Sequence, residues 1–506
     1  MKTRILLSLG VAALTLSAAP VTGDDHAFDA EADMAQRIAQ IEAHEGGEDG
    51  INAIIIHSQT AGFKARAAAQ TGILKGRSVL VKDNIETQEW ATTAGSLALK
   101  YNFTKRDAPL IANLREAGGV VLGKTNLSEW ANIRSDNSTS GWSAVGGLTR
   151  NPHATDRNSC GSSSGSGAAV AAGFAWGAIG TETNGSITCP ASINGIVGFK
   201  PSVGLVSRTH VVPISSTQDT AGPMTQTVRD AAMLLTAIAG EDPADAATVG
   251  VPRVADYSEG LGQYSLKGVR IGVMRNQIGS RSDVAAVFGT ALEDLERAGA
   301  VLVDIEFEPN RQMYGDSFTV LLFELREEMG KYLRSIPEIQ GADTPRSLAD
   351  LIAFNKANSE SEMRWFGQEL FEQAEQATDR DAYEKARENA VRIAGKETLD
   401  MLLAENNVQF LVAPTRGPAW VSDLVNGDNF GGFGIGFGSP AAIAGYPHLT
   451  VPMGAVEGLP VGISFYGAKW EDHAVLKAGA AYEKARTATL PTPSFKPWKP
   501  APQPAE

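Results

Sequence analysis

Hydrophobic positions along the chain follow a helical period in some segments and a strand pattern in others. Residues 30–44 have the apolar spacing of an amphipathic helix, and INAIII at 51–56 is typical of a strand. SVLVKDNIE at 78–86 is a short β-branched run that ends in charged and amide residues. RDAPLIANLREAGG at 106–119 predicts a helix closed by glycine, and VVLGKTN at 120–126 predicts a buried strand.

The order of helix and strand is repeated in the next part of the chain, after which the pattern changes. AAVAAGFAWGAIGT at 168–181 predicts a helix followed by a strand, and INGIVGFKP at 193–201 is another hydrophobic unit. This alternation predicts an α/β fold around a sheet covered by helices on both faces. Residues 318–407 are rich in Glu, Lys, Arg, Leu and Ala and predict several amphipathic helices. Strand character resumes in QFLVAPT at 409–415 and in LTVPM at 449–453.

These patterns favour one catalytic domain over two independent domains. We expect the domain to span residues 24–492, with about 318–407 as a helical insertion. The Pro-rich end, residues 493–506, predicts an extended tail.

The N-terminus has the pattern of a secretory signal peptide. Lys2 and Arg4 precede an apolar run over residues 5–16, which small residues follow. The run is shorter than the roughly 20 residues of a spanning helix, so we expect a signal peptide at 1–23, cleaved near Gly23. The mature protein would be periplasmic or secreted, without stable membrane insertion. An uncleaved N-terminal anchor is the alternative.

Composition and charge narrow the classes of partner. The 506 residues carry a net charge of −14, which argues against a broad basic surface for nucleic acid. The two cysteines, Cys160 and Cys189, are too few for a disulfide scaffold. Export would place them where pairing is possible, but the sequence leaves the pairing open. The oligomeric state is equally open.

Two familiar catalytic patterns fail on inspection. GGVVLGKT at 118–125 matches the phosphate-loop pattern, but there a helix precedes a strand, which is the reverse of the order that phosphate binding needs. Ser439 lies in GFGSPAA, which lacks the nucleophile elbow of a Ser-His-Asp hydrolase. The seven histidines are too scattered to indicate a catalytic base or a metal site, and they are His26, His44, His57, His153, His210, His448 and His473.

A third pattern is more specific. Ser186 follows Asn184 and Gly185 in a turn where a strand should end, and small residues there let backbone N–H groups converge as an oxyanion hole requires. A serine hydroxyl needs a base, and no histidine is near in the sequence. Lys82 ends an apolar strand, where burial would lower its pKa from ~10.4 towards the ~7–8 that a base needs. A strand-end lysine with only a structural role is the alternative.

These residues resemble the motifs of the amidase signature family. Its lysine, its serine in GGSSGGS and its nucleophilic serine in GT(D/E)xGGS correspond here to Lys82, CGSSSGS and GTETNGS. The family spacing of 24 positions between the serines selects Ser162 as the partner of Ser186. Further segments such as GKTNLSEWAN, QDTAGPM and AGYPHLTVPMG extend the resemblance over nearly all of the mature chain, and the best matches are to its peptide amidases.

The resemblance implies a fold and a mechanism. It implies a central mixed β-sheet with helices on both faces, a cis peptide bond at Gly161–Ser162, and no metal or organic cofactor. Lys82 would be the base, Ser162 the proton relay and Ser186 the nucleophile, so the chain would hydrolyse carboxamides through an acyl-enzyme. The oxyanion would bind the backbone N–H groups of the turn formed by Thr183, Asn184, Gly185 and Ser186.

The remaining expectations concern supporting residues and the substrate. Thr181 and Asp219 are candidates for supporting hydrogen bonds, and Trp142 for the substrate pocket, whereas Trp130 is expected in the core. Some relatives that bind free carboxylates carry Arg where Thr188-Cys189 stands here, which favours a neutral substrate such as the C-terminal amide of a peptide. An aryl-acylamidase or esterase using the same triad, and an inactive binding protein with this fold, are the alternatives.

Overall fold

The computed structural model describes residues 28–47, 50–338, 344–430 and 434–500. The expected signal peptide at 1–23 lies outside these residues. Within them, eleven strands form one mixed sheet in the order β1-β3-β2-β8-β10-β9-β14-β15-β13-β11-β12, which confirms the expected α/β fold. None of the described helices is long and apolar enough to cross a membrane.

The sheet mixes parallel and antiparallel pairs, and its edge strand β1 pairs antiparallel with β3. β2 pairs in parallel with both β3 and β8, so the carboxyl ends of β2 and β8 lie at the same edge of the sheet. The pairs from β8 to β13 are all antiparallel, and β13, β11 and β12 are parallel again. The strands are β1 (Ile54–His57), β2 (Ser78–Lys82), β3 (Val120–Thr125), β8 (Gly177–Glu182), β9 (Val197–Lys200), β10 (Thr220–Thr225), β11 (Arg270–Met274), β12 (Val301–Ile305), β13 (Phe410–Pro414), β14 (His448–Val456) and β15 (Leu459–Tyr466).

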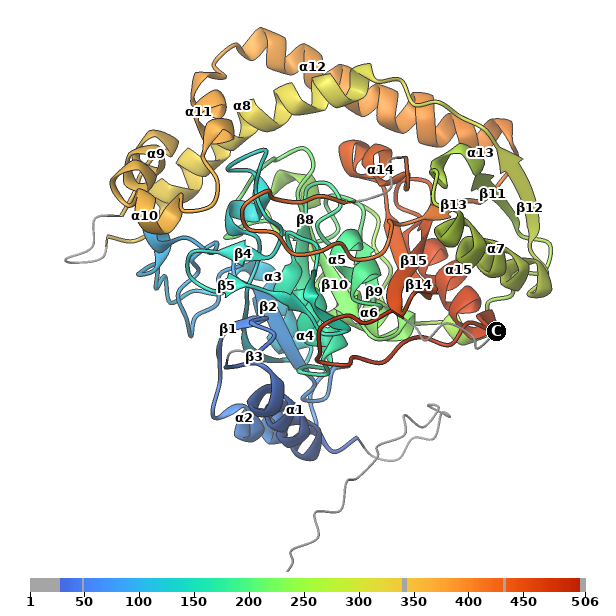
Figure 1. Ribbon diagram of the computed structural model, residues 1–506, viewed down its shortest axis with the longest axis horizontal. Coiled ribbons are helices and arrows are strands. Elements are labelled where there is room, and N and C mark those ends of the chain that lie inside the picture. The colour runs from blue at the N-terminus through green and yellow to red at the C-terminus, as the bar shows by residue number, and fades with distance from the viewer. Residues whose placement is uncertain (1–27, 48–49, 339–343, 431–433, 501–506) are drawn as a thin grey trace, which may run out of the picture.

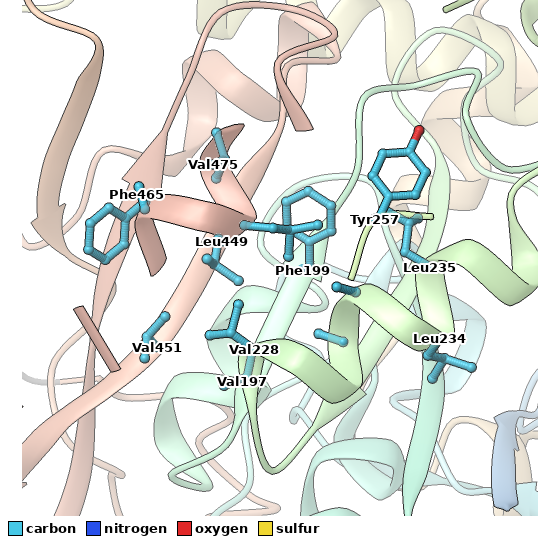
Figure 2. Packing of buried hydrophobic residues seen from close by; sticks show 14 of the residues in the cluster. Val197, Phe199, Val228, Leu234, Leu235, Tyr257, Leu449, Val451, Phe465 and Val475 are labelled. Carbon is cyan, nitrogen blue, oxygen red and sulfur yellow. The ribbon is translucent and has the colours of Figure 1, made fainter. Parts of the chain in front are cut away.

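Side chains that alternate along β2 belong to two cores, one on each face of the sheet. Val79 and Val81 of β2 belong to the larger core, which Figure 2 shows around Phe199 and Leu449. Leu80, between them, belongs to the smaller core on the other face. The larger core is covered by α3 (Pro109–Glu116), α6 (Val228–Ile238), α7 (Ser282–Arg297) and α15 (Asp472–Ala485), and the smaller by α1 (Ala30–His44), α2 (Ala61–Ala68), α4 (Ser164–Ala171) and α5 (Thr188–Ile193).

The segment expected to be a helical insertion is helical and forms a separate layer. α8 and α12 are long, pack together, and run along the top of the molecule in Figure 1. The first helix begins at residue 312, six positions before the composition changes at about 318. The helices of this layer are α8 (Gln312–Ser335), α9 (Leu348–Ala357), α10 (Ser359–Glu362), α11 (Glu369–Gln376), α12 (Arg380–Ala394) and α13 (Met401–Glu405), and α14 (Gly438–Ala444) follows β13.

The structure adds detail at two predicted segments, the strand at 51–56 and the Pro-rich end. The strand expected at 51–56 begins only at Ile54, because Asn52 has a φ of 54°, outside the extended region. The Pro-rich end forms no helix or strand over residues 493–500, and it is tied to the domain. Phe495 stacks on His44 with ring centroids 3.8 Å apart, and Trp498 Nε1 donates to Glu457 O at 3.0 Å.

Candidate active site

Lys82 is the last residue of β2, and its ammonium group is fully buried. Its Nζ donates to Ser162 Oγ at 2.8 Å, to Thr181 Oγ1 at 2.8 Å and to Thr181 O at 3.2 Å. The parallel pairing of β2 with β8 creates these contacts, since it places Lys82 beside the end of β8. The structure therefore brings together the lysine and the first serine of the predicted triad.

The environment of Lys82 favours its neutral form. Burial lowers the pKa of Lys82 to about 7, while the carboxylates of Asp219 and Glu182 act in the opposite direction. A lysine with a pKa near neutrality is available as a proton acceptor at physiological pH.

Ser162 and Ser186 lie on two loops that are joined directly. The Gly161–Ser162 peptide bond is cis, as the resemblance implied, and Ser162 is fully buried. The next residue, Ser163, donates its backbone N–H to Ser186 O at 3.2 Å. Ser186 is 9% exposed, so it is the member of the predicted triad that has exposed surface.

A buried carboxylate that the sequence analysis did not single out holds the turn before Ser186. Glu182 Oε1 accepts the Gly185 N–H at 2.8 Å, and Oε2 accepts the N–H groups of Ile187 and Thr188 at 2.8 and 3.0 Å. Glu182 thereby fixes the backbone on both sides of Ser186. The signal in the sequence was a charged residue at the end of a buried strand, directly before small residues.

This arrangement changes the expected oxyanion hole. The Gly185 N–H is already engaged with Glu182, so Gly185 is removed from the proposed set of free donors. The backbone N–H groups of Thr183, Asn184 and Ser186 donate to none of the described residues. These three remain the candidates for binding an oxyanion.

Thr181 and Asp219, the two candidates for supporting roles, both make hydrogen bonds at the site. Thr181 Oγ1 also accepts from Asn84 Nδ2 at 3.0 Å, and its backbone oxygen accepts from the Ser163 hydroxyl at 3.0 Å. Asp219 Oδ1 accepts from Thr183 Oγ1 at 2.6 Å, while Oδ2 accepts two backbone N–H groups of its own loop. The sequence analysis assigned no role to Asn84 or Ser163, and both are found in contact with Thr181.

The question of cysteine pairing is resolved in the structure. Cys160 and Cys189 form a disulfide with Cα atoms 6.0 Å apart. Cys160 stands two positions before Ser162, and Cys189 lies in α5, three positions after Ser186. The disulfide therefore links the two serine-bearing loops covalently.

Trp130 and Trp142 each pack edge-on against a phenylalanine, and a cavity lies at Thr181 and Thr183. Trp130 is a core residue, as expected, and packs edge-on against Phe371. Trp142 is 7% exposed and packs edge-on against Phe366. A cavity of about 550 Å³ reaches Thr181, Thr183 and Asp219, but Trp142 is not part of its lining. Trp142 thus lies in an aromatic pair and outside the lining of this cavity.

The two rejected patterns also have clear structures. Residues 120–125 of the phosphate-loop match form β3, and the buried Lys124 pairs with Asp83 at 3.0 Å. Ser439, at the start of α14, exchanges weak hydrogen bonds with the Asn184 side chain at 3.3 and 3.4 Å. Neither segment forms the site that its pattern would require, although Ser439 does lie beside the turn of Ser186.

Comparison with known proteins now decides the family. A family model described as Amidase matches residues 51–476, which is most of the chain. The chain belongs to the amidase signature family. A probable amidase of Arabidopsis thaliana is 37% identical over 435 residues, covering 84% of this chain and 79% of the relative. This amidase is therefore a hydrolase that acts on amide bonds.

Solved structures of relatives agree with this fold. The peptide amidase of Stenotrophomonas maltophilia superposes with a TM-score of 0.85 at 44% identity, covering 92% of this chain and 96% of that one. A peptide amidase in complex with the competitive inhibitor chymostatin gives a TM-score of 0.86 at 45% identity, covering 92% and 96%. The amidase signature fold expected from the motifs is confirmed.

Proposed function

We propose that this amidase removes the C-terminal amide of peptides and releases ammonia. The observation that carries the proposal is the buried hydrogen bond between Lys82 Nζ and Ser162 Oγ at 2.8 Å. The next residue, Ser163, donates its backbone N–H to Ser186 O and so joins the two serine loops. Similarity to peptide amidases supports the substrate class. This chain carries Thr188-Cys189 where some relatives that bind carboxylates carry an arginine, and the lack of that arginine favours a neutral substrate.

The chemistry proceeds in two halves. Neutral Lys82 accepts the proton of Ser162, Ser162 accepts the proton of Ser186, and the Ser186 oxygen attacks the amide carbon. The N–H groups of Thr183, Asn184 and Ser186 bind the oxyanion that forms. The relay then protonates the leaving nitrogen, the carbon–nitrogen bond breaks, and ammonia departs from an acyl-enzyme.

Water completes the reaction by the same route in reverse. It gives a proton to the relay and attacks the ester carbon, and the carbon–oxygen bond to Ser186 breaks. The carboxylic acid leaves, Ser186 regains its proton, and Lys82 is neutral again. All the residues that these two half-reactions require belong to this chain.

Ammonia release from an amidated dipeptide tests the proposal. We expect turnover by the wild-type protein and a loss of at least about a thousandfold in Lys82→Ala and Ser186→Ala, since the members of a relay act as a unit. An N-acyl anilide is assayed in parallel. Faster turnover of the anilide, with no ammonia from amidated peptides, would instead identify an aryl-acylamidase that uses the same residues.

We also propose that the protein is exported. The Cys160–Cys189 disulfide supports an oxidising compartment, and the sequence of residues 1–23 supports a signal peptide. Fractionation of producing cells, followed by N-terminal sequencing, tests this. We expect a periplasmic or secreted protein that begins near residue 24, and an intact N-terminus in the cytoplasmic fraction would contradict it.

A further inference from the structure

Arg416, in the segment that follows β13, has a guanidinium group without a polar partner among the described residues. Its guanidinium carbon lies 4.2 Å from the ring centre of Phe430 and 5.9 Å from that of Trp420. It makes no hydrogen bond or ion pair with any described residue, and its Nε is buried. Arg208, by contrast, donates Nε and Nη2 to the carboxylate of Asp245.

An arginine in this situation needs an acceptor. A buried donor without a partner loses the hydrogen bonds that it makes with water, so proteins keep few such groups. Burial lowers the pKa of Arg416, which reflects the same unfavourable removal from water. The two aromatic rings lie against the guanidinium group in cation–π contact and leave its buried Nε without an acceptor among the described residues. The cradle therefore holds a donor that is available to a ligand.

The cradle lies beside the two serine loops. Trp420 packs in one apolar cluster with the disulfide-forming Cys160 and Cys189. The segment also returns to the site at its other end. A side chain at Gly436 would meet Thr415 O at 2.6 Å, and three residues later Ser439 contacts Asn184 of the turn before Ser186. In Figure 1 the orange segment after β13 passes across the face of the sheet in front of β8.

The charge around Arg416 selects the kind of acceptor. Asp428 is the carboxylate whose charge acts on Arg416, and its own oxygens accept from Trp420 Nε1 and the Ser140 N–H. A ligand carboxylate would be repelled by Asp428, whereas a neutral carbonyl oxygen would not. The acyl part of a peptide amide carries peptide carbonyl groups, and these are neutral hydrogen-bond acceptors.

We propose that Arg416, cradled by Trp420 and Phe430, binds a backbone carbonyl oxygen of the substrate beyond the scissile amide. This inference rests on the proposed function and deepens it. The subsite gives the enzyme a reason to prefer peptide amides over simple amides, because only a peptide supplies the second carbonyl.

Three uncharged amides test the subsite. The first, 3-phenylpropanamide, has no carbonyl beyond the scissile one, N-acetyl-phenylalaninamide has one, and N-acetyl-alanyl-phenylalaninamide has two. In Arg416→Met we expect KM to rise at least about tenfold for one or both peptide amides, with kcat nearly unchanged, since a hydrogen bond to a charged group is lost. For 3-phenylpropanamide, kcat/KM should stay within about twofold. Arg416→Lys should recover only part of the loss.

Arg157→Met is the matched control. Arg157 lies 4.7 Å over Trp498 and also has a buried Nε without a partner, but its aromatic platform belongs to the tail. We expect it to change KM for none of the three amides beyond about twofold. Equal losses on all three amides in Arg416→Met, or no loss on any, would overturn the inference.

A binding measurement separates this inference from the proposed function. N-acetyl-alanyl-phenylalaninamide is titrated calorimetrically into Ser186→Ala and into Ser186→Ala/Arg416→Met. At least tenfold weaker binding to the double variant supports the subsite even if the wild-type protein hydrolyses no peptide amide. Equal affinities, or no binding to Ser186→Ala, would overturn the subsite.

Discussion

Lys82 is a fully buried lysine without an ion pair to any described carboxylate. Its hydrogen bonds go to two hydroxyl groups and one backbone oxygen, so nothing at close range compensates a positive charge. This environment is unfavourable for an ordinary lysine and favourable for a base.

We expect kcat/KM to rise with pH and to reach a plateau, with a midpoint near the Lys82 pKa of about 7. The lowered pKa makes the neutral, reactive form dominant above the midpoint and the inactive ammonium form dominant below it. A pH–rate profile with a neutral amide substrate measures the midpoint. A profile that stays flat from pH 5 to 9 would contradict the assignment of Lys82 as the base.

Lys82→Met should lose activity by at least about a thousandfold, and its effect on stability should depend on pH. Below pH 7 the folded wild-type protein holds a buried ammonium group, and the penalty for it is complete. The penalty declines as pH rises from about 7 towards the ~10.4 of an unfolded lysine. The Tm of the variant relative to wild type should therefore be higher at pH 6 than at pH 9. A difference in Tm that does not change with pH would count against a lowered pKa.

Glu182→Gln should lower kcat about a hundredfold with a smaller change in KM. The amide can accept through only one oxygen, so at least one of the three backbone N–H groups held by Glu182 is released. Loss of its charge should also move the midpoint of the pH profile downward, because the Glu182 carboxylate raises the pKa of Lys82. Glu483→Gln is the control, since Glu483 accepts the Val228 N–H in the contact of α15 with α6. A Glu182→Gln midpoint at or above that of wild type would refute the electrostatic part.

At the residue scale, the sequence predicted the catalytic candidates but not the residues that surround them. Lys82, Ser162 and Ser186 stand out because the family motifs fix their residue types and their spacing. Glu182 occupies the acidic position of the same motif, but its role is not evident from the sequence, because its partners are backbone N–H groups, which any residue supplies. Arg416 does not stand out, because its environment depends on aromatic rings brought together by the fold.

At the scale of elements, the site is built from strand ends and from the loops that follow them. Periodicity predicted β2, β3, β8 and their flanking helices because each carries a complete apolar pattern of its own. It left the pairing of Cys160 with Cys189 open, since pairing depends on the distance between two loops. That distance is set when α4 and α5 pack on the same face of the sheet.

Removal of the disulfide should affect both stability and activity. For a separation of 29 residues, Cys160→Ser with Cys189→Ser should lower the free energy of unfolding by about 3–4 kcal/mol. We also expect kcat to fall while KM changes little, because the link holds the loops of Ser162 and Ser186 in register. Denaturant unfolding and steady-state kinetics measure the two effects. A stability loss with unchanged kcat would show that the disulfide has no positioning role.

At the scale of the whole molecule, the helical layer is connected to the active site. Glu324 of α8 accepts from Thr217 Oγ1 at 2.6 Å, and Ser317 Oγ of α8 donates to Gln218 Oε1 at 2.7 Å. Gln218 in turn donates to Thr183 O at 3.3 Å. The helical composition of this layer was evident in the sequence, but these contacts were not, because they join residues about a hundred positions apart. The strand order likewise depends on pairings between distant segments and could not be derived from periodicity.

The proposed mechanism depends on one hydroxyl group, that of the nucleophile Ser186, and covalent labelling tests this assignment most directly. The wild-type protein is treated with a serine-directed fluorophosphonate, and the adduct is located by peptide mass spectrometry. The account predicts a single adduct at Ser186, formed at least about a hundredfold more slowly in Lys82→Ala and in Ser162→Ala. An adduct at another serine such as Ser439, or labelling of Ser186 at the same rate without Lys82, would contradict it.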